Sequence, residues 1–155
     1  MNTVIDQYGQ ILLEAMGQTL LLALYGLLFA CILGLIFGML SVVKNKVCNV
    51  IAYIFVYAIR GVPMIVLAFF IFFGVPYLFN TIFEGLFAEK ITLTALQAGT
   101  ACLALNCGAY MSEIIRAGIQ SVDRGQMEAA RSLGMTYWRS MFKVVLPQAI
   151  RTMIP

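Results

Sequence analysis

Long apolar runs without an Asp, Glu, Lys or Arg side chain dominate the pattern of this chain. Three such runs cover residues 15–43, 61–83 and 91–112. Each run is long enough for the roughly 18–20 apolar residues with which a helix crosses about 30 Å of hydrocarbon. The pattern predicts a single all-α integral membrane domain over residues 1–155, with three spans at about these positions.

A fourth uncharged run, residues 47–59, is too short to span a bilayer by itself. Two placements fit its length. The run lies at the membrane interface, or it forms the first turns of a longer helix that continues into the second span.

Composition strengthens the membrane interpretation. Of the 155 residues, 62% are hydrophobic and 11% are charged, and the mean hydropathy is +0.93, whereas soluble domains carry roughly a quarter charged residues. Such a chain cannot cover its surface with polar groups, so lipid is the expected solvent. Asp6 and Glu14 occupy the place of the basic segment of a cleavable signal peptide, so we expect the first span to be the targeting signal.

The charges between the apolar runs predict an orientation. With three spans, nine of the ten basic residues fall on one side, together with the tail after Ser112. The positive-inside rule makes that side cytoplasmic and places the N-terminus outside. These nine residues are Lys44, Lys46, Arg60, Arg116, Arg124, Arg131, Arg139, Lys143 and Arg151.

The first two spans carry residues that shape helix packing. Small residues recur every fourth position in the first span, which predicts a groove where another helix approaches closely. In the second span, Pro63 and Pro76 each remove a backbone donor, which predicts a kink or a helix end. The small residues are Gly26, Ala30, Gly34 and Gly38.

The third span is the most polar. Asn106, Tyr110 and Glu113 share one helix face because they are spaced i, i+4 and i+7. Polar groups inside a membrane usually face the bundle interior or a water-filled path, so these three residues are candidates for a substrate path. For Glu113 the alternative is a position at the cytoplasmic interface, paired with Arg116 or with Arg60.

The segment after the third span, about residues 117–147, shows the spacing of short amphipathic helices. Asp123 is a candidate N-cap, and Gln126 three residues later completes a capping-box pattern. Glu128 and Arg131 lie on the polar face of this helix. Its apolar face is predicted to comprise Met127, Ala130 and Leu133.

A second short helix is predicted to follow. Gly134 stands where a helix C-cap glycine belongs, and the next helix, about residues 136–145, is expected to end at Leu146 and Pro147. Two short helices joined at a glycine form a compact, rigid unit with an alanine-rich surface. Such a unit docks a partner protein or rests on lipid headgroups as an amphipathic helix, and the pattern alone favours neither.

The spacing in this segment resembles the EAA signature of ABC importer permeases. That signature reads EAA, three residues, G, nine residues, then I-x-L-P, and the chain departs from it only at Val144, which replaces the isoleucine. The resemblance implies that this loop binds an ATPase. The matching residues are Glu128, Ala129, Ala130, Gly134, Leu146 and Pro147.

Other segments resemble the polar-amino-acid group of these permeases (histidine, glutamine, glutamate and arginine), most closely the glutamine type. Residues 60–63 are similar to the group's RGTP, with Val62 in place of threonine, and residues 108–119 are similar to its AY-x-[AS]-E-I-x-R-x-G-I stretch. The residues with an implied structural role are Arg60, Gly61 and Pro63.

The resemblance implies a permease subunit with the type I ABC importer transmembrane fold, in a bacterial inner or plasma membrane. Its implied partners are a second permease subunit (identical or related), cytoplasmic ABC ATPase subunits, an extracytoplasmic amino-acid-binding protein and a polar amino acid as cargo. Members of the group have about five spans. We therefore expect the chain to be C-terminally incomplete, and the alternative function is a truncated permease fragment that does not transport.

An enzymatic role is not expected. The chain has no histidine, and its spans offer Glu113 no second carboxylate, so intramembrane proton-transfer chemistry lacks a partner. There is no Walker A pattern, so ATP is expected to bind the partner ATPase, and no cofactor, metal or nucleic acid is expected on this chain.

Overall fold

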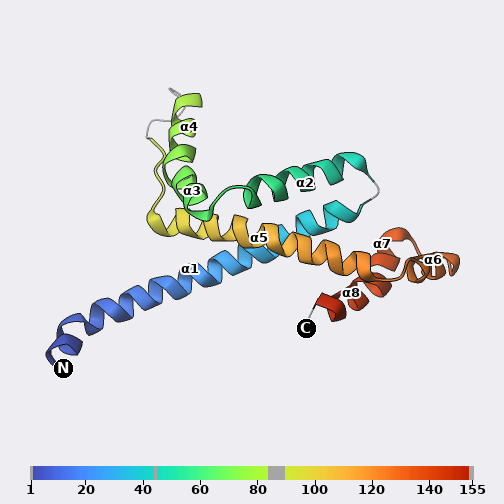
Figure 1. Cartoon of the computed structure of the whole chain (residues 1–155), viewed down its shortest axis with the longest axis horizontal. Coiled ribbons are helices and arrows are strands. Elements are labelled where there is room, and N and C mark those ends of the chain that lie inside the picture. Colours follow the sequence, from blue (N-terminus) through green and yellow to red (C-terminus); the bar gives the residue numbers. More distant parts are fainter. Residues whose placement is uncertain (1, 44, 84–89, 154–155) are drawn as a thin grey trace.

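The computed structural model describes residues 2–43, 45–83 and 90–153, which form helices joined by short connections (Figure 1). Lys44, used in the orientation argument, and the side chain of Asp6, used in the signal-peptide argument, lie outside this description. No strand occurs in these three ranges, so the all-α prediction is confirmed for them. In chain order the helices are α1 (Asn2–Val42), α2 (Lys46–Arg60), α3 (Met64–Phe69), α4 (Val75–Ile82), α5 (Ala95–Ser121), α6 (Arg124–Ser132), α7 (Tyr137–Ser140) and α8 (Leu146–Met153).

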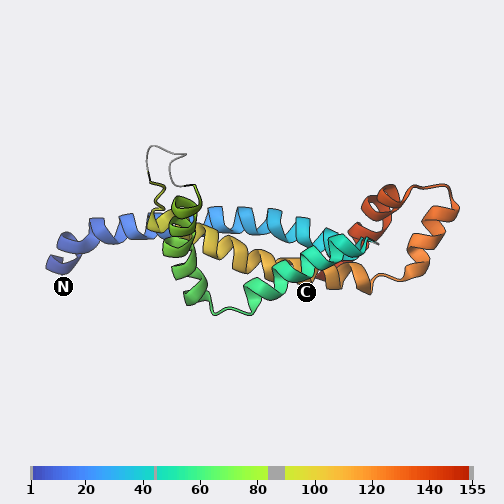
Figure 2. The same ribbon diagram turned by 90° about the horizontal axis from the view of Figure 1, so that it is seen from above.

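Helices α1 and α5 pack along each other and form the axis of the molecule (Figures 1 and 2). The predicted groove of the first span is the contact surface. Ala30 is fully buried there, and a Cβ added at Gly34 would lie 2.6 Å from Cβ of Met111. Helix α5 contributes Gly108, where an added Cβ would lie 3.0 Å from Cβ of Leu33. The close approach predicted from the small residues is therefore confirmed.

Within the described residues, two stretches are long and apolar enough to cross a membrane, Tyr8–Val42 in α1 and Met64–Ile82 from α3 to α4. They correspond to the first and second predicted spans. Most of their large apolar side chains are exposed, as expected for surfaces that face lipid. The third span stays a prediction, and its helix begins at Ala95 rather than at residue 91 because Thr94 caps it.

Helix α2 accounts for the short uncharged run. It is a separate helix that ends at Arg60 and is capped by Gly61, so the interpretation of a longer helix continuing into the second span is wrong. Val62 precedes Pro63, and a residue before proline avoids helical geometry, which explains the break. Helix α2 folds back onto α1, and the rings of Phe37 and Phe55 stack with their centroids 3.8 Å apart.

Two prolines lie inside continuous helical segments, each just after a π-helical turn. These turns are η1 (Phe70–Gly74), between α3 and α4, and η2 (Met141–Val145), between α7 and α8. The extra residue in a π-helical turn makes room for a proline ring that would clash with the carbonyl four residues earlier. Pro76 and Pro147 therefore do not end their helices, and the prediction that the last loop helix ends at Pro147 is wrong, since α8 continues to Met153.

The start of α5 gives a first testable prediction. The Thr94 hydroxyl accepts a hydrogen bond from the Gln97 amide at 3.2 Å, and the Gln97 side chain accepts one from the Thr94 amide at 3.0 Å. Thr94→Ala should lower the free energy of unfolding by about 1 kcal/mol, measured by chemical denaturation in detergent. Thr81→Ala is the control, because that hydroxyl only bonds a carbonyl of its own helix. Equal losses in both variants would contradict the assigned cap.

Candidate functional site

The loop formed by α6, α7 and η2 begins at a capped helix end. The Asp123 carboxylate accepts a hydrogen bond from the Gly125 amide at 2.6 Å, which confirms the predicted N-cap. Gln126 does not complete a capping box, and this part of the prediction is wrong. Its side-chain oxygen instead accepts a hydrogen bond from Gln148 at 3.3 Å, which ties α6 to α8.

Gly134 closes α6 with a Schellman motif. Its φ of +82° is the only positive φ among the described residues. The Gly134 amide donates to the Arg131 carbonyl at 2.9 Å, and the Met135 amide donates to the Ala130 carbonyl at 3.2 Å. The predicted C-cap glycine is therefore confirmed, and the turn between α6 and α7 is fixed by two backbone hydrogen bonds.

The loop is anchored by a buried apolar cluster below α5. Two side chains of α5 pack against η2 and α8, with the end of α1 and Met127 around them. Burial raises the pKa of the Tyr137 hydroxyl, which packs on this cluster and stays neutral at ordinary pH. The loop is thus a rigid extension of α5. The buried members are Ile115, Ile119, Met141, Val145 and Ala149.

The predicted apolar face of α6 is only partly correct. Ala130 is buried and Met127 is half-buried, but the Leu133 side chain is 85% exposed. Leu133 is the C-cap residue at the end of α6, and it is not among the residues that pack on the buried cluster of the loop.

The exposed side of the loop carries both expected and unexpected residues. Glu128, Ala129, Gly134 and Pro147 of the signature are exposed, whereas Leu146 packs inward. Sequence reasoning missed Trp138 and Phe142, which are half exposed and stack with centroids 6.2 Å apart. Their i, i+4 spacing in a predicted helix was the available signal. We define the outer loop surface as Glu128, Ala129, Leu133, Trp138 and Phe142; α6 and α7 lie beyond the C-terminal end of α1 (Figure 1).

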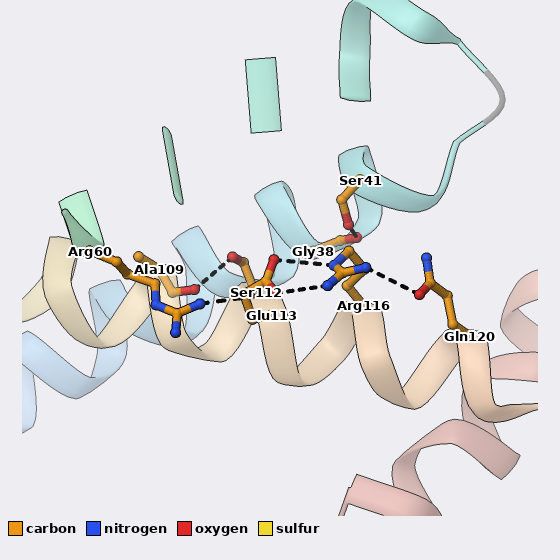
Figure 3. Close-up of polar contacts among 8 residues, drawn as sticks. All are labelled: Gly38, Ser41, Arg60, Ala109, Ser112, Glu113, Arg116 and Gln120. Atoms are coloured by element: carbon orange, nitrogen blue, oxygen red, sulfur yellow. Dashed lines mark hydrogen bonds and ion pairs between the residues drawn. The ribbon is translucent and has the colours of Figure 1, made fainter. Parts of the chain in front are cut away.

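The second group of candidate residues is a cluster around Glu113 on α5 (Figure 3). Arg116 donates two hydrogen bonds to the Glu113 carboxylate, at 3.1 and 2.8 Å. Nη1 of Arg60 lies 4.0 Å from the same carboxylate. The Arg60 guanidinium also covers the Tyr110 ring, 4.7 Å from its centroid, and Arg116 donates to Gln120 at 3.2 Å.

Both expected partners of Glu113 are therefore present at once. Two guanidinium groups surround one carboxylate, so the cluster has an excess of positive charge that favours an anionic group nearby. Asn106 is half-buried two turns before Glu113 and takes no part in these contacts among the described residues. The structure thus brings Tyr110 and Glu113 together with Arg60, and their role in a substrate path stays a prediction.

The remaining motif residues position Arg60. The Gly61 amide donates to the Tyr57 carbonyl at 2.9 Å, and a Cβ at Gly61 would lie 2.8 Å from that oxygen. Pro63 then begins α3 as its N-cap. Lys46 begins α2 at the end of the molecule where α1 and α2 meet. Arg60 ends the same helix about 20 Å further along it, and this places Arg60 beside Glu113.

Among the described residues, two long apolar helical stretches, a charged cluster beside α2 and a rigid glycine-capped loop describe a helical membrane protein. The chain belongs to the family described as the binding-protein-dependent transport system inner membrane component, whose model matches residues 15–155. This assignment makes the chain a membrane component of a binding-protein-dependent transport system.

Individual relatives agree with this family. The chain is 43% identical over 97 residues to the probable glutamine ABC transporter permease protein GlnM of Bacillus subtilis (strain 168), covering 63% of this chain and 40% of the relative. It is 39% identical over 121 residues to the nopaline transport system permease protein NocM of Agrobacterium fabrum (strain C58 / ATCC 33970), covering 76% and 48%. The matched segments thus span less than half of either relative.

One solved structure resembles almost the whole chain. It is a crystal structure of an amino acid ABC transporter with histidines, with a TM-score of 0.77 and 34% sequence identity. The match covers 99% of this chain and 66% of that one. The type I importer fold expected from the sequence agrees with this similarity.

Proposed function

We propose that the chain acts as the permease subunit of an ATP-driven amino-acid importer. The observation that carries this proposal is the rigid loop, because its signature residues form a Schellman-capped unit anchored to the end of α5. A rigid unit transmits a displacement of a bound partner to the spans, whereas a flexible loop would absorb it. Relatives named for glutamine and nopaline transport support a polar amino acid as cargo.

The outer loop surface is the proposed docking site for the cytoplasmic ATPase subunits. These ATPase subunits bind and hydrolyse the ATP, and no cofactor is assigned to this chain. A second permease subunit completes the translocation path, and an extracytoplasmic binding protein delivers the cargo. In this proposal the chain lies in a bacterial inner or plasma membrane as a multi-pass protein, with its N-terminus outside and the loop in the cytoplasm.

The decisive experiment is reconstitution of the permease with its ATPase in proteoliposomes. Uptake of a radiolabelled polar amino acid should require ATP and the binding protein, and the ATPase should co-purify with the permease. ATP-dependent co-purification without uptake of any polar amino acid would contradict the importer assignment.

The Glu113 cluster supports the proposal that these residues contact the cargo along the translocation path. The Glu113 carboxylate can accept a hydrogen bond from the ammonium group of a passing amino acid, and Arg60 can bind the carboxylate of the same molecule. Glu113→Gln should therefore raise the KM for uptake about tenfold, equal to about 1.4 kcal/mol, because the ammonium group loses its counter-charge. Concentration-dependent uptake in proteoliposomes measures this change.

Glu128→Gln on α6 is the matched control. Because Glu128 lies on the outer loop surface, this variant should weaken ATPase co-purification and leave KM unchanged. The same effect of both variants on KM would show that Glu113 does not contact the cargo.

A further inference from the structure

The loop carries two arginines on the side of α6 that is turned toward α1 and α5. Arg124 and Arg131 are seven residues apart, so they lie about 10 Å from each other along one side of the helix. Met127 stands between them on the same side, and its side chain packs on the buried cluster below α5. We define Arg124, Met127 and Arg131 as the inner face of α6, as distinct from the outer loop surface.

Both arginines stand beside the end of the first apolar stretch. Val43 contributes to the walls of two hollows, of which one is shared with Arg131 and the other with Arg124. Val43 directly follows the stretch Tyr8–Val42, which is long and apolar enough to cross a membrane. In the proposed topology this end of the stretch is cytoplasmic, so both arginines lie where the bilayer meets the cytoplasm.

The positive charge of both arginines is left without a partner. Neither guanidinium forms an ion pair or a hydrogen bond within the described part of the chain, and both residues are exposed. The neighbouring Asp123 carboxylate caps α6 through the Gly125 amide instead of pairing with Arg124. Phosphate oxygens accept paired hydrogen bonds from a guanidinium, and the cytoplasmic leaflet attracts basic residues through its anionic lipids.

The hollow beside Arg131 fits part of a lipid better than a free small molecule. Its volume is about 270 Å³, below the roughly 300–1,000 Å³ of typical small-molecule pockets. The rest of its wall is formed by Val43, Tyr137 and Trp138. Tyrosine and tryptophan are enriched at membrane interfaces, where an apolar ring lies at the level of the headgroups. A phosphate next to Arg131 would therefore continue into glycerol and acyl carbons along this apolar wall.

We propose that the inner face of α6 binds the phosphate groups of anionic phospholipids in the cytoplasmic leaflet, and that this contact braces the loop against the bilayer. This inference rests on the proposed importer function and its topology. The buried cluster attaches the loop to α5, and the lipid contact gives α6 a second attachment on the side opposite the docked ATPase. A loop held at both sides passes the displacement of the ATPase to the spans with less loss.

The test compares uptake by the complete transporter in proteoliposomes of phosphatidylcholine with and without phosphatidylglycerol. Phosphatidylglycerol should raise the initial uptake rate about fivefold or more, since each basic residue near an anionic surface favours binding by about that factor. Zwitterionic phosphatidylethanolamine, or inorganic phosphate sealed inside the vesicles, should not replace it. The Arg124→Gln/Arg131→Gln double variant should lose the response to phosphatidylglycerol.

Arg139→Gln/Lys143→Gln is the matched control. It removes the same charge from the same loop, both residues are exposed, and neither lines the two hollows that Val43 shares with the inner face. This variant should keep the response to phosphatidylglycerol. Phosphatidylglycerol retained by the purified complex, counted by mass spectrometry, should fall in the first double variant and not in the control, and this readout does not require uptake.

The outcomes separate the lipid site from the importer function. Equal uptake with and without phosphatidylglycerol, or a response and retained lipid that survive in Arg124→Gln/Arg131→Gln, overturns the lipid site and leaves the importer intact. Weaker ATPase co-purification of this variant in lipid-free detergent assigns the two arginines to the ATPase and also overturns the site. Absence of uptake by the parent in every lipid mixture overturns the importer itself.

Discussion

Replacing Gly134 with valine should abolish ATP-driven uptake while membrane insertion stays intact. Gly134 has a φ of +82°, and a Cβ added there would meet nothing within 4 Å. The penalty is therefore confined to the backbone, because an L-residue in the left-handed region is disfavoured by about 1–2 kcal/mol and β-branched residues suffer most. The loop escapes this strain by opening the turn, which breaks the hydrogen bonds to Arg131 and Ala130.

An opened turn disconnects α6 from α7, so the two halves of the outer loop surface no longer move as one unit when the ATPase pushes on them. ATP-dependent uptake in proteoliposomes measures the loss, and protease accessibility in membranes checks insertion. Gly134→Asn is the matched control, because asparagine tolerates the left-handed region, and it should retain most of the uptake. Normal uptake by the valine variant would show that the rigid turn is not required for coupling.

Much of the architecture could be predicted because it depends on strong local signals. A helix that crosses a lipid bilayer must be long and uncharged, which makes such helices visible in the sequence. The runs at residues 15–43 and 61–83 correspond to the apolar stretches of α1 and of α3 to α4. The four small residues of α1 mark where another helix approaches closely, since few other residues permit that approach. The caps at Asp123 and Gly134 are local backbone features with their own residue preferences.

The wrong predictions concern features that depend on the tertiary structure rather than on the local sequence. The π-helical turns that precede Pro76 and Pro147 depend on one extra residue per turn, which hydrophobic periodicity does not reveal. Leu133 was assigned inward from helical spacing, but α6 ends one residue too early for that. The pairing of Glu113 was predicted correctly but not uniquely: Arg60 and Arg116 were offered as alternatives, and both contact the carboxylate.

The close approach of α1 and α5 leads to the second large expected effect. Gly34→Leu should lower the free energy of unfolding by about 3 kcal/mol, because overpacking a tight contact forces the backbones apart. The first added atom already conflicts: a Cβ at Gly34 would lie 2.6 Å from Cβ of Met111 and 3.4 Å from the Gly108 carbonyl oxygen. Neither of these atoms is the end of a flexible side chain that could move aside.

Gly17→Leu in the same helix is the matched control. A Cβ at Gly17 would meet nothing within 4 Å, and leucine is a better helix former than glycine, so this variant should be as stable as the parent or slightly more stable. Denaturation in detergent, followed through the fluorescence of Trp138, the chain's one tryptophan, gives both values. Because α5 also carries the Glu113 cluster and the loop, Gly34→Leu should weaken ATPase co-purification as well. Equal stability of the two variants would mean that α1 and α5 do not pack through Gly34.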